Sequence, residues 1–319
     1  MNNHAARLAS LFRCPHCHHK MLQAFTDKLI CPSCSRAYPL VRGVPVLLTS
    51  ASQSMREQEL STNTGKLMVS EYHAIGAEAG DGSPDTATRK PWYAWLRPPP
   101  VIYHPNPRLD SIETAILFTH QGVDTLVLNV GGGPTKYRPQ EITLNLEAFH
   151  NVDVVGDAHN LPLNDASVDS IICNAVLEHV RDPHHVVAEL IRVLKPGGML
   201  YAEVPFIFFF HGYPNDFTRF TREGMKRLFR DLDEPTIGIS GGPMSALLQT
   251  ANIVLPMLVP SSNRFFRKLV NGAFRWVVFP LKYLDIWLNK KSEAHLTASG
   301  FYVIGRRAPV PIGLESGVR

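Results

Sequence analysis

The sequence predicts an α/β fold, in which an open and mostly parallel sheet follows a small cysteine-rich unit. Residues 125–130 have the Val-Leu-Val character of a buried strand and are stopped by three consecutive glycines at 131–133. Shorter strand-like segments follow, spaced as successive βα units, and four cysteines stand in two pairs near the N-terminus. With 319 residues, 45% of them hydrophobic, the chain has room for one large domain and one small one.

The strand-like segments that follow the glycines define the predicted sheet. Two of them end in an acid, Glu147 and Asp157. Because the carboxyl ends of parallel strands meet at one edge, acids there predict a nucleoside site, and a glycine turn lets a ligand approach the backbone. The segments are 142–149, 152–162, 168–180 and 194–206.

Three sequence motifs carry a family resemblance. They are LPLNDASVD at 161–169, LEHV at 177–180 and RVLKPGG at 192–198, in this order. Over about residues 108–307 the chain resembles class I S-adenosylmethionine-dependent methyltransferases, and several motifs in order are stronger evidence than one. The resemblance implies a methyltransferase with a Rossmann-like sheet whose last strand is antiparallel, here 299–307.

The resemblance also implies which residues bind S-adenosylmethionine. The glycines leave room for the methionine portion of the cofactor. Glu147 accepts hydrogen bonds from the ribose hydroxyls, and Asp157 with Ala158 accepts one from the adenine amine. Solvated acids at strand ends are the alternative for both carboxylates. The full set expected to bind the cofactor is Asn129, Gly131, Gly133, Glu147, Asp157, Ala158 and Asn174.

The glycine turn departs from the family pattern. Asn129 stands where the family has an acid, and Thr135 replaces the third glycine. Only eight residues, 134–141, precede the next strand, whereas a helical crossover needs about a dozen, so the helix expected there is cut short. Asn129, Tyr137 or Arg138 could take its place beside the cofactor's carboxylate.

A polar loop, HGYPNDFTRFT at 211–221, contains the expected catalytic residues His211, Asp216 and Arg219. His211 or Asp216 would act as general base for a hydroxyl or amine, and Arg219 would hold an anionic group. A hydrogen-bonded structural turn is the alternative for this loop. His179 lies either near the cofactor or in the wall of its pocket.

The acceptor is expected to be a hydroxyl or amine of a small molecule, sugar or lipid-linked intermediate. A ribosomal or transfer RNA acceptor and a non-catalytic cofactor-binding scaffold remain the alternatives, with nucleic acid less favoured as a partner. A nicotinamide-dependent dehydrogenase is disfavoured, because Lys136 stands where its loop needs a glycine.

Two Cys-x-x-Cys pairs, separated by thirteen residues, form the N-terminal unit. Four thiolates at this spacing predict a tetrahedral zinc, and because a Cys₄ site is closed the metal is structural. The unit resembles the small zinc-ribbon family that also serves as an activating subunit of methyltransferases. The expected zinc ligands are Cys14, Cys17, Cys31 and Cys34.

The domain organisation predicted from these segments has three parts. Residues 1–49 form the zinc ribbon, 50–107 a linker with a Pro/aromatic segment, and 108–319 the methyltransferase domain, with an insertion at about 243–297. The linker assignment rests on its Ser, Thr, Gly and Asp content.

The positive charge is concentrated in residues 1–49 and 261–291, although the whole chain has a formal net charge of only +4. The second stretch interleaves seven Lys or Arg with aromatic residues, as in a helix that rests on an anionic membrane or an amphiphilic substrate. Aromatic residues that cap the sheet as core are the alternative. No signal peptide or spanning run is recognised, so the expected location is cytoplasmic, with peripheral contact at the inner face of the membrane.

Overall fold

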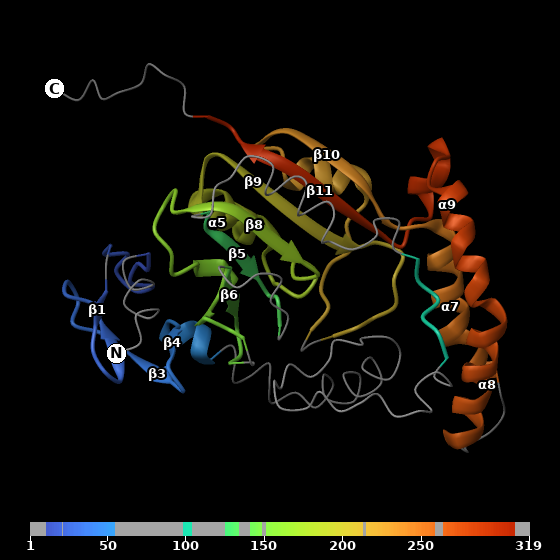
Figure 1. Cartoon of the computed structure of the whole chain (residues 1–319), viewed down its shortest axis with the longest axis horizontal. Helices are drawn as coiled ribbons and strands as arrows, with labels where there is room; N and C mark the ends of the chain where they lie inside the picture. The colour runs from blue at the N-terminus through green and yellow to red at the C-terminus, as the bar shows by residue number, and fades with distance from the viewer. Residues whose placement is uncertain are drawn as a thin grey trace.

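The computed structural model describes residues 11–20, 22–54, 98–103, 125–133, 141–148, 151–212, 215–258 and 264–309. Within these residues the strands form one 11-stranded sheet, in the order β1-β2-β3-β4-β7-β6-β5-β8-β9-β11-β10 (Figure 1). Several predicted segments lie outside the described residues. They are a helix that apolar spacing predicts at 109–120, an amphipathic helical turn predicted at 66–75, the Pro/aromatic segment of the linker at 91–95, and Tyr137 and Arg138.

The centre of the sheet is parallel, as the sequence predicts. The central strands pair with one another in parallel, for example through Leu128 with Ile142 and with Ile171. All four residues of β5 are buried, which explains its continuous apolar sequence. The central strands are β5 (Val127–Val130), β6 (Ile142–Asn145), β7 (Val154–Gly156), β8 (Val168–Asn174) and β9 (Leu194–Pro205).

The far edge of the sheet is antiparallel. β11 (Gly300–Arg307) pairs antiparallel with both β9 and β10 (Leu232–Gly241). It is the antiparallel last strand that the family resemblance implies. Before β10, Thr221 caps helix α6 (Arg222–Leu228) by accepting a hydrogen bond from the backbone of Gly224.

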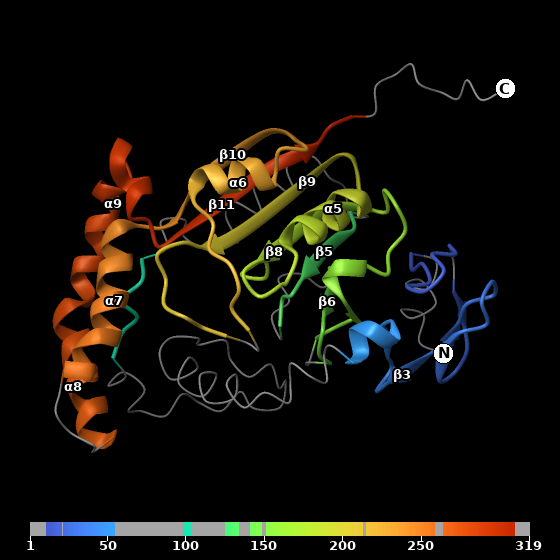
Figure 2. The same cartoon turned by 180° about the vertical axis from the view of Figure 1, so that it is seen from behind.

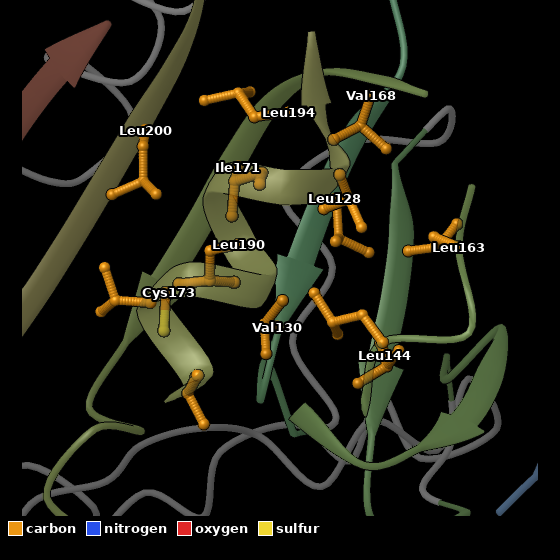
Figure 3. Packing of buried hydrophobic residues seen from close by; sticks show 14 of the residues in the cluster. Leu128, Val130, Leu144, Leu163, Val168, Ile171, Cys173, Leu190, Leu194 and Leu200 are labelled. Carbon is orange, nitrogen blue, oxygen red and sulfur yellow. The ribbon is translucent and has the colours of Figure 1, made fainter. Parts of the chain in front are cut away.

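Helix α5 (Pro183–Val193) covers the centre of the sheet and completes the core. The side chain of Asp182 accepts from the backbone of His185 and so fixes the start of the helix. Figure 3 shows Leu190 from this helix close to Ile171 and Cys173 of β8. The Cys173 side chain is fully buried, so it is part of the core of the protein.

A helical arm, residues 243–296, stands between β10 and β11 at one end of the sheet (Figures 1 and 2). Asp285 holds it together: its fully buried carboxylate accepts from the backbone of Met244 and from the backbone and hydroxyl of Ser245, at the start of α7. The arm comprises α7 (Pro243–Leu258), α8 (Arg264–Val278), η3 (Phe279–Leu284), α9 (Asp285–Leu288) and η4 (Ser292–Leu296).

The zinc ribbon lies at the opposite end and extends the same sheet. Its last strand, β4, pairs in parallel with β7 through Val46 and Val155. Sequence periodicity held no signal for this pairing, because a four-residue strand has the same pattern whether its edge is open or paired. The ribbon strands are β1 (Gln23–Ala24), β2 (Lys28–Ile30), β3 (Ala37–Val41) and β4 (Val44–Leu47).

Candidate cofactor and metal sites

The four ribbon cysteines come together as predicted. Their sulfur atoms all lie within 4.8 Å of one another, with 3.7 Å between Cys14 and Cys34 and 3.5 Å between Cys17 and Cys31. A tetrahedral zinc with bonds of about 2.3 Å needs sulfurs about 3.8 Å apart, so the donor set fits this metal. The arrangement can bind one closed, structural zinc.

Local backbone geometry presents these thiols. In each Cys-x-x-Cys pair the residue after the second cysteine, His18 or Ser35, has a φ of 58°. Its N–H bonds back to the carbonyl of the first cysteine, which closes the turn around the metal position. The hydroxyl of Tyr38 lies 3.1 Å from the Cys14 sulfur and can donate a hydrogen bond to a thiolate there. Burial and the nearby Cys14 sulfur raise the pKa of Tyr38.

The glycine turn leads from β5 toward the carboxyl edge of the sheet. Gly131 and Gly133 have φ values of +72° and +56°, which favour glycine. A Cβ at Gly131 would collide with Val176, but none of the described residues lies within 4 Å of the Cβ position of Gly133. With respect to these residues, the turn is packed at Gly131 and open at Gly133, where a ligand can approach the backbone.

The predicted cofactor residues Glu147, Asp157 and Asn174 follow or end the parallel strands β6, β7 and β8. Adjacent parallel strands put them on the edge to which the glycine turn leads. Glu147 is partly exposed, as a group that binds the ribose of a ligand requires. The arrangement fits a nucleoside cofactor whose ribose and base lie over β6 and β7.

Asp157 is 8% exposed and accepts three hydrogen bonds. Its Oδ1 accepts from the backbone and the Nδ1 of His159, each at 2.9 Å, and its Oδ2 from the hydroxyl of Ser52 at 2.7 Å. Burial raises the pKa of Asp157, but these bonds outweigh burial and hold it below its ordinary value. A carboxylate offers about four acceptor positions, so one remains for an adenine amine.

Asn129, which replaces the usual acid, is buried and donates to Oε1 of Glu141 at 2.9 Å. Thr143 donates to the same oxygen at 3.3 Å. Glu141 thus places a buried carboxylate near the glycine turn, which the sequence analysis missed. The available signal was its position, directly before the apolar strand that begins at Ile142.

The structure brings His211, Asp216 and Arg219 together. Asp216 accepts from both terminal nitrogens of Arg219 and, at 2.9 Å, from the backbone of His211. Burial raises the pKa of Asp216, but the Arg219 and His211 bonds outweigh it and hold the pKa below its ordinary value. Arg219 also donates to the carbonyls of Thr218 and Phe209, so these nitrogens hold the loop itself.

Glu178 is a further residue that sequence analysis missed. It is fully buried and its Oε1 lies 3.3 Å from Nε2 of His211 and 3.7 Å from Nε2 of His179. The sequence signal for its burial was the position of Glu178 between Leu177 and Val180 in the LEHV motif, because an acid within an apolar turn is buried together with that turn. These three side chains form a cluster, hereafter the Glu-His-His cluster, beside the predicted catalytic loop.

The remaining family motifs build the scaffold. Arg192 from RVLKPGG bonds to Glu189 and Asp165, and to the carbonyl of Leu161. Arg13 of the ribbon joins the same network, 3.3 Å from Glu189. The motif residues therefore tie α5, the loop before β8 and the ribbon into one unit.

Comparisons with known proteins agree with this geometry. A family model described as a methyltransferase domain matches residues 135–202, and one described as a Trm112p-like protein matches residues 6–43. A 37.1 kDa protein in transposon TN4556 of Streptomyces fradiae is 34% identical over 114 residues, which are 35% of this chain and 31% of that protein. A protein of Mycolicibacterium smegmatis described as a probable S-adenosylmethionine-dependent methyltransferase is 44% identical over 50 residues, or 16% of this chain and 20% of that protein.

Two solved structures are similar to part of this chain. The Haemonchus contortus phosphoethanolamine N-methyltransferase 2 has a TM-score of 0.41 and 13% identity, covering 68% of this chain and 56% of that one. A complex of the Haloferax volcanii Trm112 methyltransferase activator with a methyltransferase has a TM-score of 0.33 and 18% identity, covering 58% of this chain and 83% of that one.

The alignments thus span less than a third of the two curated relatives, but one matched model falls within each of the two predicted units. They confirm the predicted fold class, the S-adenosylmethionine cofactor and the zinc-binding ribbon. The chain carries a methyltransferase domain of the S-adenosylmethionine-dependent class, preceded by a Trm112p-like zinc ribbon.

Proposed function

We propose that this protein transfers a methyl group from S-adenosylmethionine to a hydroxyl or amine of a small molecule, sugar or lipid-linked acceptor. The observation that carries the proposal is the open glycine turn at Gly133, on the same sheet edge as Glu147 and Asp157. Together with the matched methyltransferase domain, this edge favours a nucleoside cofactor with a reactive methyl group.

The bound cofactor would supply an electrophilic methyl group, and the protein would position it. Glu147 would accept from the ribose hydroxyls, and Asp157 with Ala158 would hold the adenine. Gly131 and Gly133 would give room for the methionine portion, with Asn129 behind them. Asn174, which ends β8, would lie on the methyl side of the site.

The acceptor would lie beside the loop that contains His211. Asp216 is paired with Arg219 and has a lowered pKa, so it is a weak base, and the imidazole of His211 is the better candidate to take a proton. Arg219, held by Asp216, would fix the shape of the loop while its positive charge still favours an anionic part of the acceptor.

A methyl-transfer screen tests this function. The full chain is incubated with methyl-labelled S-adenosylmethionine and separate small-molecule, lipid and RNA fractions of a cell extract. Label in the lipid or small-molecule fraction supports the proposal, and label in RNA selects the RNA alternative. Cofactor binding without transfer to any fraction would favour a scaffold. At a cofactor concentration well below saturation, Glu147→Ala should weaken the signal, and the exposed Glu223→Ala should keep it.

We also propose that residues 261–291 rest on an anionic membrane surface. Several aromatic rings of α8 and the turns after it are solvent-exposed, including Trp276 at 44% and Trp287 at 59%, whereas Phe274 and Phe279 are half-buried. The exposed rings argue against a core in which all of these residues cap the sheet. Arg267, Lys268, Lys290 and Lys291 are exposed cations on the same arm. Among the described helices, none combines the length and apolarity needed to cross a bilayer.

Two of the seven cations serve the fold instead. Buried Arg275 donates hydrogen bonds to the carbonyls of Pro98 and Pro99, and buried Lys282 donates one to the carbonyl of Pro100.

Co-sedimentation with anionic and neutral vesicles tests the membrane contact. The proposal is supported if the wild type binds anionic vesicles and a Trp276→Ser, Trp287→Ser variant does not. A wild-type protein that stays in the supernatant with both kinds of vesicle would contradict the proposed membrane contact.

A further inference from the structure

The Glu-His-His cluster contains a buried carboxylate without a hydrogen bond. Glu178 has no exposed surface, and neither of its carboxylate oxygens has a hydrogen-bond partner among the residues that the structure describes. An isolated buried carboxylate costs several kcal/mol or more, so a compensating positive charge is required. The closest groups are the two imidazoles of His179 and His211.

Hydrogen bonds fix the tautomer of each imidazole. Nδ1 of His179 lies 2.6 Å from the carbonyl oxygen of Asn215, and because a carbonyl only accepts, Nδ1 carries the proton. Nδ1 of His211 faces the carbonyl of Phe209 at 3.3 Å and the carboxylate of Asp216 at 3.4 Å, so the same holds there. Both Nε2 atoms therefore direct a lone pair toward Glu178.

The Glu178 carboxylate and the two Nε2 atoms thus point their electron pairs at one position. These three groups repel one another unless a cation lies between them. Metal bonds of about 2.0–2.2 Å to nitrogen and oxygen put neighbouring ligand atoms about 3.2–3.6 Å apart. The observed separations are 3.3 and 3.7 Å, and all three ligand atoms lie within 4.8 Å of one another. An Nδ1–H bonded to a carbonyl or carboxylate is also the arrangement typical of metal-ligating histidines.

We propose that Glu178, His179 and His211 bind a divalent transition-metal cation, such as zinc, that is separate from the ribbon zinc. Imidazole and carboxylate ligands suit zinc and its neighbours better than magnesium or calcium. Asp216 and the carbonyl of Asn215 orient the two imidazoles without touching the ion. Three protein ligands leave coordination positions open, in contrast to the closed Cys₄ site.

The location gives the open positions a use. His211 follows β9 and Glu178 follows β8, so the ion lies at the carboxyl edge where these parallel strands end. An oxygen or nitrogen of the methyl acceptor can bind there and be oriented toward the cofactor. With the metal on Nε2 and a proton on Nδ1, His211 would act as a ligand in place of the base role given to it above, and the ion would lower the pKa of a bound acceptor hydroxyl. This use rests on the proposed function, whereas metal binding itself does not.

Metal content tests the proposal without substrate or cofactor. The full chain is dialysed against Zn²⁺ and then against metal-free buffer, and zinc per chain is measured by mass spectrometry. Two equivalents are expected in the wild type and in His184→Ala, which removes an exposed histidine. One equivalent is expected in Glu178→Gln, in His211→Ala and in Cys31→Ser. A single equivalent in the wild type would mean that a proton neutralises the cluster and would overturn the proposal.

Two equivalents in both Glu178→Gln and the wild type would also overturn it, by placing the second ion elsewhere. Far-ultraviolet circular dichroism shows whether each variant is folded. If the ligand variants do not fold, Asp216→Asn leaves all three ligands in place and should weaken binding of the second zinc about 10- to 100-fold. An unchanged affinity in that variant would contradict the proposed orientation of His211.

Discussion

The hydroxyl of Ser52 donates to Oδ2 of Asp157 at 2.7 Å, across 105 positions of sequence. Ser52 lies in a helical turn directly after the ribbon, and its backbone N–H bonds to the hydroxyl of Thr49. Asp157 ends the neighbouring segment, one residue after β7. The turn that follows the ribbon therefore contacts the predicted adenine-binding carboxylate through one buried hydrogen bond.

Ser52→Ala should lower the affinity for S-adenosylmethionine about fivefold, the equivalent of about 1 kcal/mol. Without the hydroxyl, the Asp157 carboxylate loses one of the three donors that hold it in place. Calorimetric titration of the cofactor measures the change. Ser54→Ala, an exposed serine in the same turn, is the matched control, and equal affinities in the two variants would contradict this role.

Removal of zinc should destabilise more than the ribbon. Because β4 pairs with β7, unfolding of the ribbon exposes an edge of the central sheet next to Asp157. Cys31→Ser should lose one equivalent of zinc and lower the melting temperature of the whole chain, as should a strong chelator. A metal-free chain with a fully folded ribbon would show that the four cysteines do not bind a structural metal.

Glu189 should be among the most sensitive positions outside the cofactor site. Its carboxylate bonds to Arg192, to the backbone of Leu161 and to Arg13 of the ribbon. Glu189→Ala leaves two largely buried guanidinium groups without this partner and should cost about 3–5 kcal/mol of unfolding free energy. Urea denaturation measures this loss, and the exposed Glu223→Ala is the control, which should change the unfolding free energy far less.

The pH dependence of stability should report on Asp216. Its pKa is lowered in the folded protein, so its stabilising effect is complete above the unfolded-state value of about 3.9 and is lost as pH falls through the folded-state value. The stability difference between wild type and Asp216→Asn should therefore be constant above about pH 5 and shrink below pH 4. Asp231→Asn, at an exposed position, should show no such change.

The parallel core and its edge residues could be predicted from sequence because each is a local pattern. Apolar runs that end in Gly131, Glu147 or Asp157 carry their own strand and edge signal. The antiparallel direction of the last strand, by contrast, was implied by the family resemblance. The cysteine knuckles were equally readable, because metal geometry fixes their spacing.

What the sequence did not reveal are contacts between distant segments. Nothing in the spacing of residues 44–47 shows that this strand joins β7, or that Ser52 reaches Asp157. The apolar neighbours of Glu141 and Glu178 signal that these acids are buried, but not what they contact. Their partners, Asn129 and the two histidines, are set by the register and packing of the sheet rather than by neighbours in sequence.

The most direct test of the account is calorimetric titration of S-adenosylmethionine into the wild type, Glu147→Ala and Asp157→Ala. The account predicts that the wild type binds and that each variant loses about 1–3 kcal/mol, or about 5- to 150-fold in affinity. Thermal melting of each variant checks that it is folded, since Asp157 also holds Ser52. Absence of binding by the wild type, or an unchanged affinity in both variants, would contradict the assigned cofactor site.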